Sequence, residues 1–303
     1  MIWLLLLLAM GLLGGWLLAQ STQTSLADAR ETATGQFVQL SDGQTHFAWH
    51  GPEDGRVMVC IHGLSSPSYV WDAMIPHLTV QGFRVLTYDL YGRGLSDRVP
   101  GPQTREFFMR QLRDLLASQG IDRPVTLCGY SMGGRIAAAR AVEAPDQVSQ
   151  LILIASAGFQ AELGSLASIT IRYPVLGDWL HAVLGPILMN WDMARAKPAG
   201  AAADAVARRV QADLRIDGSM AAILSSMRNL LSEEAAEDHA LIAKSGLPVL
   251  AIWAAEDQVI PITSMGLLAR NNRAAQQVQI EGADHRLPYS HPEALAEAIE
   301  NSL

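Results

Sequence analysis

The 303-residue sequence is poor in cysteine, in charge and in aromatic residues. Its two cysteines, Cys60 and Cys128, are too few to define a disulfide framework, and each lies in an apolar run, so we expect two small buried side chains. Charged residues make up 17% of the chain, the net charge is -8, and Lys and Arg form no basic stripe. A nucleic-acid partner is not expected, because phosphate recognition needs concentrated positive charge.

Charged side chains are also absent from the N-terminus, where residues 2–19 are all apolar or glycine. As a helix this stretch would span about 27 Å, close to the thickness of a bilayer core. We predict that residues 1–19 form an uncleaved membrane anchor. The alternative is a signal segment whose removal leaves a secreted or periplasmic protein, although such a segment usually has a shorter apolar region behind a basic residue. The membrane face stays open, because acidic residues flank Arg30, the first basic side chain.

Residues 20–35 are rich in Ser, Thr and Ala and show no apolar period. This composition predicts a polar tether between the anchor and the rest of the chain. Residues 36–303 are then expected to form one folded domain, since α/β chains of this length are routinely a single domain.

Apolar runs of strand length alternate with amphipathic helical stretches along this domain. Two short runs at residues 37–40 and 45–50 flank a turn and predict an opening β-hairpin. Continuous Val, Ile and Leu runs between helices then indicate a mostly parallel, eight-stranded sheet with helices on both faces, which is an α/β fold. The further predicted strands are residues 57–61, 83–88, 125–127, 151–155, 247–253 and 278–280, and the predicted helices are residues 68–81, 104–119, 132–143, 263–271 and 292–299.

The alternation is interrupted after the sixth strand. Residues 157 to about 243 have a helical composition and no strand run, which predicts a helical cap inserted at this point. Large apolar side chains of the cap are candidates for lining a binding cavity. They are Trp179, Met189, Trp191, Met193, Met220 and Met227. The competing interpretation is that they only pack the cap helices together.

A Gly-x-Ser-x-Gly pattern occupies residues 129–133, directly after a predicted strand and before a predicted helix. This is the context of a nucleophile elbow, in which Gly129 and Gly133 permit a tight turn that projects the Ser131 hydroxyl above the sheet. A serine that only caps the helix is the simpler interpretation. The preceding strand and the small residues of the following helix favour Ser131 as a nucleophile.

A serine nucleophile needs a base within hydrogen-bond reach and a carboxylate that orients the base. After the cap, one predicted strand is followed by Glu256 and Asp257, and the next by His285. Both positions lie at carboxyl ends of parallel strands, where open α/β sheets bind ligands. We predict Asp257 and His285 as the partners of Ser131. Glu256 is the rival for the carboxylate and His291, at the entry to the last helix, is the rival for the base.

Two backbone amides are expected to complete the site by binding an oxyanion. In this arrangement one belongs to the residue after the nucleophile, which is Met132. The other comes from the loop after the third strand, where the sequence reads His62-Gly63-Leu64, and we assign it to the Leu64 N–H. His62 has the chemistry of a base, but its place at a strand end predicts that it braces this loop.

These motifs, taken in order, resemble the α/β-hydrolase superfamily from residue 36 to the C-terminus. The matching segments are residues 62–64 with Trp71, residues 89–96, residues 129–134, residues 257–261, and His285. The resemblance implies the α/β-hydrolase fold and structural roles for Asp89 and Ser96, which shape the loop after the fourth strand. The chain departs from the family at Ala254 and Asp284, where glycine is common, and Asp284 puts a further carboxylate beside His285.

The expected function is therefore serine hydrolysis of a carboxylic ester, without a metal or an organic cofactor. The apolar N-terminus and cap favour a lipophilic ester, and they make the chain similar to membrane-anchored monoacylglycerol lipases and related esterases. Carbon–carbon bond hydrolases, thioesterases and cofactor-free haloperoxidases use the same three side chains and stay open as alternatives. A ligand-binding protein that kept the fold without turnover is the non-enzymatic alternative.

Overall fold

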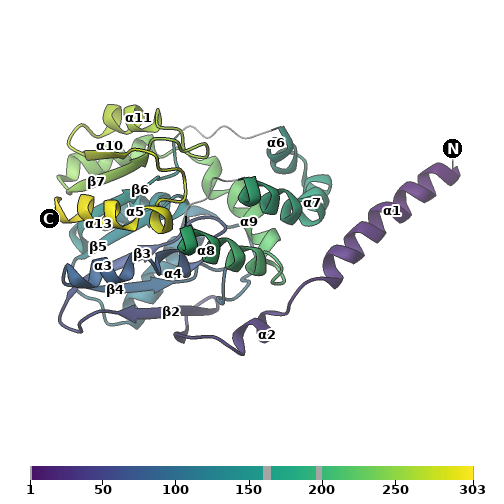
Figure 1. Cartoon of the computed structure of the whole chain (residues 1–303), viewed down its shortest axis with the longest axis horizontal. Coiled ribbons are helices and arrows are strands. Elements are labelled where there is room, and N and C mark those ends of the chain that lie inside the picture. Colours follow the sequence, from purple (N-terminus) through teal and green to yellow (C-terminus); the bar gives the residue numbers. More distant parts are fainter. Residues whose placement is uncertain (1, 160–164, 196–199, 303) are drawn as a thin grey trace.

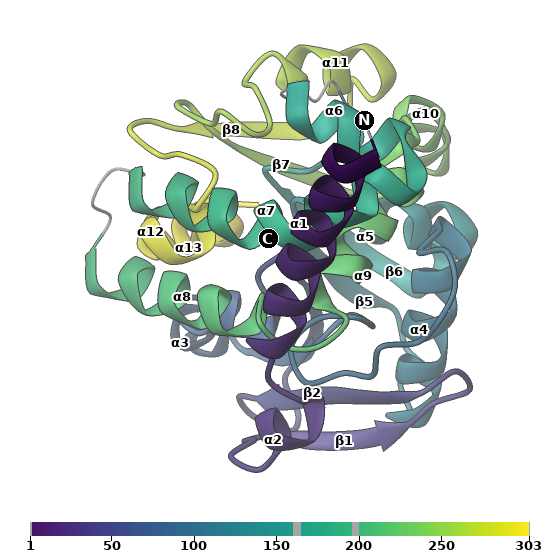
Figure 2. The same ribbon diagram turned by 90° about the vertical axis from the view of Figure 1, so that its right-hand side faces the viewer.

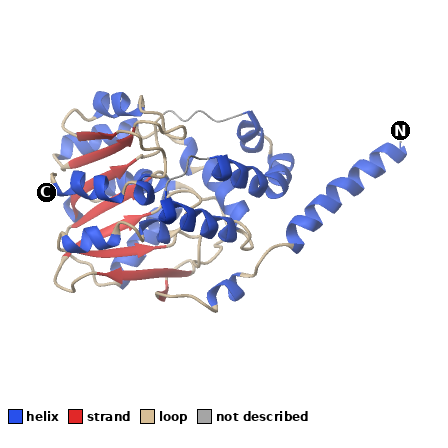
Figure 3. Ribbon diagram, viewed as in Figure 1, coloured by secondary structure: helices blue, strands red, loops and turns tan. Residues whose placement is uncertain are grey.

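The computed structural model describes residues 2–159, 165–195 and 200–302, except the side chains of residues 2, 4–9, 165, 166, 192 and 194. Eight strands form one sheet, helices cover both faces, and a group of helices lies beyond one end of the strands (Figure 1, Figure 3). The strands are β1 Gln36–Gln39, β2 Gln44–His50, β3 Arg56–Ile61, β4 Phe83–Tyr88, β5 Val125–Tyr130, β6 Val148–Ile154, β7 Val249–Ala254 and β8 Gln276–Ile280.

The helices outside the cap are α1 Ile2–Ser21, α2 Leu26–Arg30, α3 Ile75–Val80, α4 Arg105–Ser118, α5 Met132–Glu143, α10 Ala236–Ser245, α11 Ser264–Asn271, α12 Leu287–Ser290 and α13 Pro292–Glu300. The cap contains α6 Ser165–Arg172, α7 Pro174–Arg195, α8 Gly200–Asp213 and α9 Ser219–Arg228. Short 3₁₀ helices are η1 Ser68–Trp71, η2 Pro145–Gln147 and η3 Leu230–Ser232.

The sheet has the strand order β1-β2-β4-β3-β5-β6-β7-β8. β2 pairs antiparallel with both β1 and β4, and every later pair is parallel. The parallel strands therefore end at one common edge, where the loops that follow β3, β5, β7 and β8 meet. The predicted α/β class, with eight strands and a cap after β6, is confirmed.

The central strands are buried on both faces, which explains their uninterrupted apolar sequences. In β3, Val59 and Ile61 pack in the cluster that contains α4 and α5, whereas Met58 and Cys60 pack in the cluster that contains α3 and α13. Cys128 of β5 lies in the second cluster as well, opposite Cys60 in the register. Both cysteines are buried free thiols, as predicted.

The structure differs from the predicted elements mainly at one helix. The stretch expected to be a helix at residues 68–81 is divided into η1 and α3. Pro76 lies in the first turn of α3, where its missing N–H costs no hydrogen bond, so the chain begins a new helix there instead of continuing the first. β5 also extends beyond the predicted residue 127 to Tyr130, because it pairs with β6 over that length.

The cap packs on the sheet through its own apolar cluster, which includes Val206, Val210, Leu214, Met220 and Ile223. Tyr69 of η1 joins this cluster and connects the cap to the loop after β3. α10 belongs instead to the sheet's helical layer, since it packs against α5 and α11.

The N-terminal residues lie against the cap. α1 contacts α7, with the Trp179 Nε1–H donating to the Leu12 carbonyl at 2.9 Å (Figure 2). Within the predicted tether, Thr24 forms a parallel bridge with Ile216 in the cap, and Arg30 pairs with Asp97 at 2.8 Å. The segment 20–35 is thus fastened to both cap and core.

Among the residues that the structure describes, no helix has both the length and the hydropathy needed to cross a membrane. The predicted anchor at residues 1–19 includes residues whose side chains lie outside the described part of the chain.

Candidate active site

Ser131 lies at the turn between β5 and α5, with φ 53° and ψ −118°. A positive φ is unusual for a residue with a side chain and costs on the order of 1–3 kcal/mol. The turn is held by the Ser131 N–H, which donates to the Ile154 carbonyl at 2.9 Å. A Cβ on Gly133 would lie 2.0 Å from the Ile61 carbonyl oxygen, and one on Gly129 would lie 2.4 Å from that of Gly133. Both glycines are therefore required by close backbone contacts.

The structure brings together the three side chains that the sequence singled out. His285 Nε2 lies 3.0 Å from Ser131 Oγ, and His285 Nδ1 lies 2.8 Å from Asp257 Oδ2. Asp257 Oδ1 accepts from the N–H groups of Val259 and Ile260, each at 2.8 Å, so both carboxylate oxygens have partners. Because a carboxylate only accepts, the proton of a neutral His285 lies on Nδ1, and Nε2 is left to accept from Ser131.

The rival residues lie elsewhere. Glu256 is exposed, whereas Asp257 is buried at 6% exposure. His291 is the N-cap residue that precedes α13, and its Nδ1 lies 2.9 Å from the Ser290 hydroxyl. Burial alone would raise the pKa of Asp284, but hydrogen bonds from Arg286 outweigh it, and this pKa falls below its usual range. The extra carboxylate beside His285 is thus held by Arg286.

The segments that carry the predicted oxyanion donors adjoin Ser131. A Cβ on Gly63 would be 3.3 Å from Ser131 Cβ, which places the loop after β3 against the nucleophile. In the described part of the chain, the Leu64 N–H donates to no other group. Met132 is the first residue of α5, where amides have no acceptor within the helix. A helix N-terminus also carries partial positive charge, which favours an anion.

His62 braces this loop, as the sequence predicted. It is fully buried, its Nδ1 lies 2.8 Å from the Gly63 carbonyl oxygen, and its Nε2 accepts from the Leu90 N–H at 2.9 Å. The second bond assigns the ring proton to Nδ1. Burial lowers the pKa of His62 to about 4, so the ring is neutral at pH 7.

The turn after β4, which positions Leu90, is held by Asp89. The buried Asp89 carboxylate accepts from the Ser68 N–H at 2.8 Å and the Leu95 N–H at 2.9 Å, and lies 2.8 Å from His46 Nδ1. The Ser96 hydroxyl donates to the Asp89 carbonyl at 2.6 Å. Asp89 and Ser96 therefore have the structural roles that the sequence implied.

Sequence reasoning missed a contact made by Tyr130, the residue before the nucleophile. Its hydroxyl donates to the His285 carbonyl at 2.7 Å, and its ring lies 5.2 Å from the His285 ring. This contact joins the turns that carry Ser131 and His285, which are 154 residues apart. An aromatic hydroxyl inside the Gly-x-Ser-x-Gly pattern was the available signal, but its partner is a backbone group that no sequence pattern marks.

A cavity of about 970 Å³ opens beside His285. Met189 and Met193 of α7, Val210 of α8 and Tyr289 of α12 line it, as the cap prediction proposed for the two methionines. Of the other candidates, Met220 and Met227 pack in the cap cluster, Trp179 contacts α1, and Trp191 is exposed. Within the described residues, no group of three His, Cys, Asp or Glu side chains is arranged to hold a metal ion.

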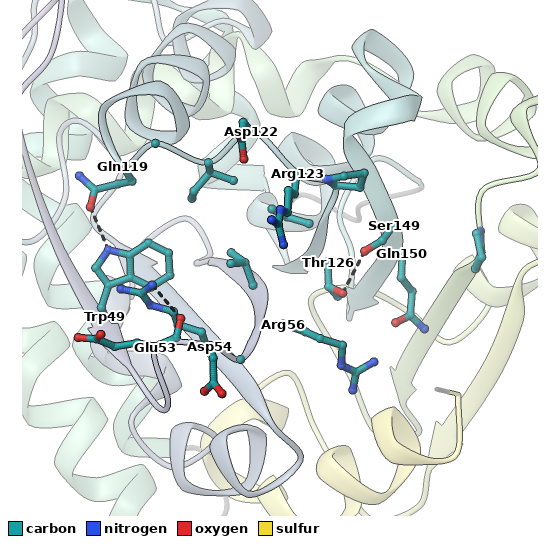
Figure 4. A pocket seen from close by; sticks show the side chains of 18 of the residues that line it. Trp49, Glu53, Asp54, Arg56, Gln119, Asp122, Arg123, Thr126, Ser149 and Gln150 are labelled. Carbon is teal, nitrogen blue, oxygen red and sulfur yellow. Dashed lines mark hydrogen bonds between the residues drawn. The ribbon is translucent and has the colours of Figure 1, made fainter.

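Figure 4 shows a second cavity, of about 810 Å³, at the amino ends of the strands. Arg56 and Arg84, at the starts of β3 and β4, contribute to its lining. The hydroxyls of Thr126 and Ser149 lie 3.5 Å apart there. No histidine is among the described residues that line this cavity, so its hydroxyls have no imidazole base like the one beside Ser131.

Comparison with known proteins identifies the fold family. The family described as alpha/beta hydrolase fold matches residues 56–292. A pimeloyl-[acyl-carrier protein] methyl ester esterase from Neisseria meningitidis serogroup C is 26% identical over 253 residues, covering 81% of this chain and 92% of that protein. A 2-hydroxy-6-oxononadienedioate/2-hydroxy-6-oxononatrienedioate hydrolase from Cupriavidus pinatubonensis is 33% identical over 139 residues, 44% of this chain and 48% of that protein.

Among solved structures, a bacterial membrane phospholipase A superposes with a TM-score of 0.71 at 22% identity. The superposition covers 99% of this chain and 96% of that protein. At this identity the likeness concerns the fold alone.

Proposed function

The chain belongs to the α/β-hydrolase fold family, and from that premise we propose that it is a serine hydrolase that cleaves carboxylic esters. The hydrogen-bonded series from Ser131 through His285 to Asp257, at 3.0 and 2.8 Å, carries the proposal. As Ser131 Oγ attacks the ester carbonyl, His285 Nε2 takes its proton and then gives it to the leaving alcohol. Asp257 holds the ring and stabilises the imidazolium.

The attack forms a bond from Ser131 Oγ to the carbonyl carbon and places negative charge on the carbonyl oxygen. The Leu64 and Met132 N–H groups are proposed to bind this oxyanion, and each such donor is worth roughly 3–4 kcal/mol in the transition state. Loss of the alcohol leaves an acyl group on Ser131. Water, deprotonated by His285, then releases the carboxylic acid and restores the serine.

The substrate class is proposed from the cavity beside His285. Charged residues, among them Arg195 and Arg286, form part of its lining, and the apolar side chains of Met189, Met193, Val210 and Val259 form a part that suits an acyl chain or another lipophilic group. Methionine side chains are flexible and adapt to different chain shapes. A lipophilic ester therefore fits better than a small polar one.

The N-terminus is proposed to attach the enzyme to a membrane. Of the 17 large apolar side chains that are exposed in the described part of the chain, seven lie on α1 and seven lie between residues 169 and 191. Exposed apolar surface of this extent marks a membrane or protein interaction site. α1 carries no charged residue.

Replacement of Ser131 by Ala tests the reaction. We expect it to remove hydrolysis of p-nitrophenyl esters across a chain-length series, by about 10⁶-fold, because the serine, base and acid act as one unit. Ser131-dependent labelling by a fluorophosphonate probe separates an enzyme from a ligand-binding protein of the same fold. Unchanged ester hydrolysis in Ser131→Ala would overturn the proposal.

A ring-cleavage dienoate belongs in the same substrate panel, because the Cupriavidus relative is named as a hydrolase of that kind. An acyl-CoA and peroxide-dependent bromination cover the remaining alternatives. A preference for the dienoate with Ser131-dependent turnover would move the assignment to carbon–carbon bond hydrolysis.

Flotation of the full chain with phosphatidylcholine and phosphatidylglycerol vesicles tests the membrane proposal. Leu13 and Leu17 of α1 are 56% and 52% exposed, and their joint replacement by Lys is expected to abolish flotation. Val80→Lys is the matched control, because Val80 is 89% exposed on α3. Equal flotation of wild type and the double variant would contradict the proposal.

A further inference from the structure

Arg93, in the turn after β4, is a buried cation beneath the cap. Its side chain is 2% exposed, and all five of its N–H donors have acceptors. The Nε–H donates to the Leu64 carbonyl at 3.0 Å. One terminal nitrogen donates to the Tyr91 carbonyl at 3.1 Å and to Gln103 Oε1. The other terminal nitrogen donates to the Ala222 carbonyl at 3.2 Å and to Ser226 Oγ at 2.7 Å. Every one of these acceptors is uncharged.

This environment is costly for a charge. Burial lowers the pKa of Arg93 to about 9, and its five acceptors include no carboxylate. A buried charge is kept only where its hydrogen bonds are well satisfied, and apolar residues of similar size often stabilise such sites more. Lysine offers three donors instead of five and lacks the planar fork. Stability alone therefore does not explain an arginine at position 93, whereas the need for five donors in a planar arrangement does.

Two of the acceptors of Arg93, Tyr91 and Gln103, lie in its own segment between β4 and α4, and the other three lie in two other parts of the molecule. Ala222 and Ser226 lie on α9 of the cap, whereas Leu64 lies on the loop after β3. α9 approaches the turn closely, since a Cβ on Gly92 would lie 2.4 Å from Ala222 Cβ. Arg93 fills the junction and bonds to both sides.

On the loop side, two neighbouring peptide groups are held. The Gly63 carbonyl, which shares a peptide plane with the Leu64 N–H, is held by His62 at 2.8 Å. The Leu64 carbonyl, in the next peptide, is held by Arg93 at 3.0 Å. Because both planes flank the Leu64 Cα, the two contacts together set the direction of the Leu64 N–H.

We infer that Arg93 is a positioning residue that connects cap helix α9 to Leu64 by hydrogen bonds. The position of the cap then determines the direction in which the oxyanion-binding N–H of Leu64 points. The inference rests on the proposed function, in which that N–H binds the oxyanion. A substrate that seats in the cavity under the cap would then align the loop through Arg93, which links acyl-group recognition to the rate of the chemical step.

The test compares Arg93→Lys and Ser226→Ala with Ser225→Ala. Ser225 is the matched control, because it lies on the same helix and accepts from the Gln103 N–H at 3.0 Å without contacting Arg93. If the Leu64 N–H points in the wrong direction, only binding of the transition state is weakened, so kcat should fall with KM unchanged. We expect about a 100-fold loss in Arg93→Lys, as for a displacement near 1 Å, a smaller loss in Ser226→Ala, and wild-type kcat in Ser225→Ala.

A second readout is the affinity for an alkyl boronic acid, whose tetrahedral adduct on Ser131 occupies the oxyanion position. The Kd should rise in parallel with the loss of kcat in Arg93→Lys and Ser226→Ala, and stay constant in Ser225→Ala. If Arg93→Lys does not fold, as judged by circular dichroism, Ser226→Ala carries both measurements.

The outcomes separate the two proposals. Wild type that neither hydrolyses esters nor binds the boronic acid overturns the proposed function and the inference with it. Ser131-dependent hydrolysis, with wild-type kcat and boronate affinity in Ser226→Ala and in folded Arg93→Lys, overturns the inference alone. A rise in KM at constant kcat also overturns it, because that result assigns Arg93 to ground-state binding.

Discussion

The two ends of the parallel sheet carry cavities of similar size, about 970 Å³ at the carboxyl ends and about 810 Å³ at the amino ends. Both contain or adjoin serine hydroxyls. At the carboxyl ends, Ser131 has a histidine at 3.0 Å, whereas at the amino ends Ser149 has the Thr126 hydroxyl at 3.5 Å. Cavity volume therefore does not distinguish a reactive site from an inert one, and the neighbours of the hydroxyl do.

The topology explains why the reactive groups collect at one end. Each helix that follows a parallel strand begins at the carboxyl end of that strand, so the free amides and the positive ends of helix dipoles gather there. The loops after β3, β5, β7 and β8 then bring Leu64, Ser131, Asp257 and His285 to one place. At the opposite end the helices finish, and that cavity is lined by charged residues such as Arg56 and Asp122.

Asp257→Asn at the carboxyl ends should lower the rate of ester hydrolysis far more than a matched substitution at the amino ends, and this is the largest effect that we expect. The amide oxygen would keep accepting from the Val259 and Ile260 N–H groups, so the amide NH2 would face His285 Nδ1 and favour the proton on Nε2. We therefore expect kcat for ester hydrolysis to fall about 10⁴-fold with the fold intact. Asp122→Asn in the amino-end cavity is the matched control and should keep the wild-type rate. Comparable rates in the two variants would remove the distinction between the ends.

Gly133→Ala should be next in effect, acting on the folding of the nucleophile turn. Its Cβ would lie 2.0 Å from the Ile61 carbonyl oxygen, and overpacking of this kind costs about 3 kcal/mol or more. Gly266→Ala in α11 has no atom within 4 Å and should instead stabilise by up to about 1 kcal/mol. Urea denaturation measures both, and equal free energies of unfolding would show that the turn tolerates a side chain.

His62→Gln should change how stability depends on pH. The folded pKa of about 4 lies below the usual 6.5, because burial disfavours the charged ring, so only the unfolded chain binds the proton between these values. The free energy of unfolding therefore falls as pH is lowered from 6.5 to 4, by up to about 1.4 kcal/mol per pH unit for this group. Denaturation series at several pH values should show a shallower slope in the variant. An unchanged slope would mean that His62 titrates normally in the folded protein.

Ser149→Ala should have the smallest effect. The side chain is exposed at the amino-end cavity, and its hydroxyl lies 3.5 Å from that of Thr126, so we expect kcat/KM to stay within about twofold and stability within about 0.5 kcal/mol. Steady-state kinetics with the ester series measure the rate. A large loss of activity would assign a function to the second cavity.

The sequence alone predicted the features that depend on local pattern. A tight turn is indicated by a strand, then Gly129-x-Ser131-x-Gly133, then a helix of small residues. The close contacts of this turn exclude larger residues at the two glycines. Asp257 and His285 were found because each directly follows an apolar strand run, and parallel strands end at a common edge. The helix expected at residues 68–81 was divided because Pro76 permits a new first turn, which the apolar period alone does not reveal.

Only the tertiary structure decided the contacts between distant segments. The five acceptors of Arg93 come from positions between Leu64 and Ser226, and Tyr130 holds a carbonyl 155 residues away. These partners are mostly backbone groups, which every residue carries, so composition and spacing contain no trace of them. The spacing of apolar residues indicates which side chains face a core and where strands end. It therefore indicates which polar side chains lie at the carboxyl ends of the strands, where they can react. The orientation of the Leu64 N–H depends on how the cap packs on the sheet. That packing exists only when both the cap and the sheet are folded.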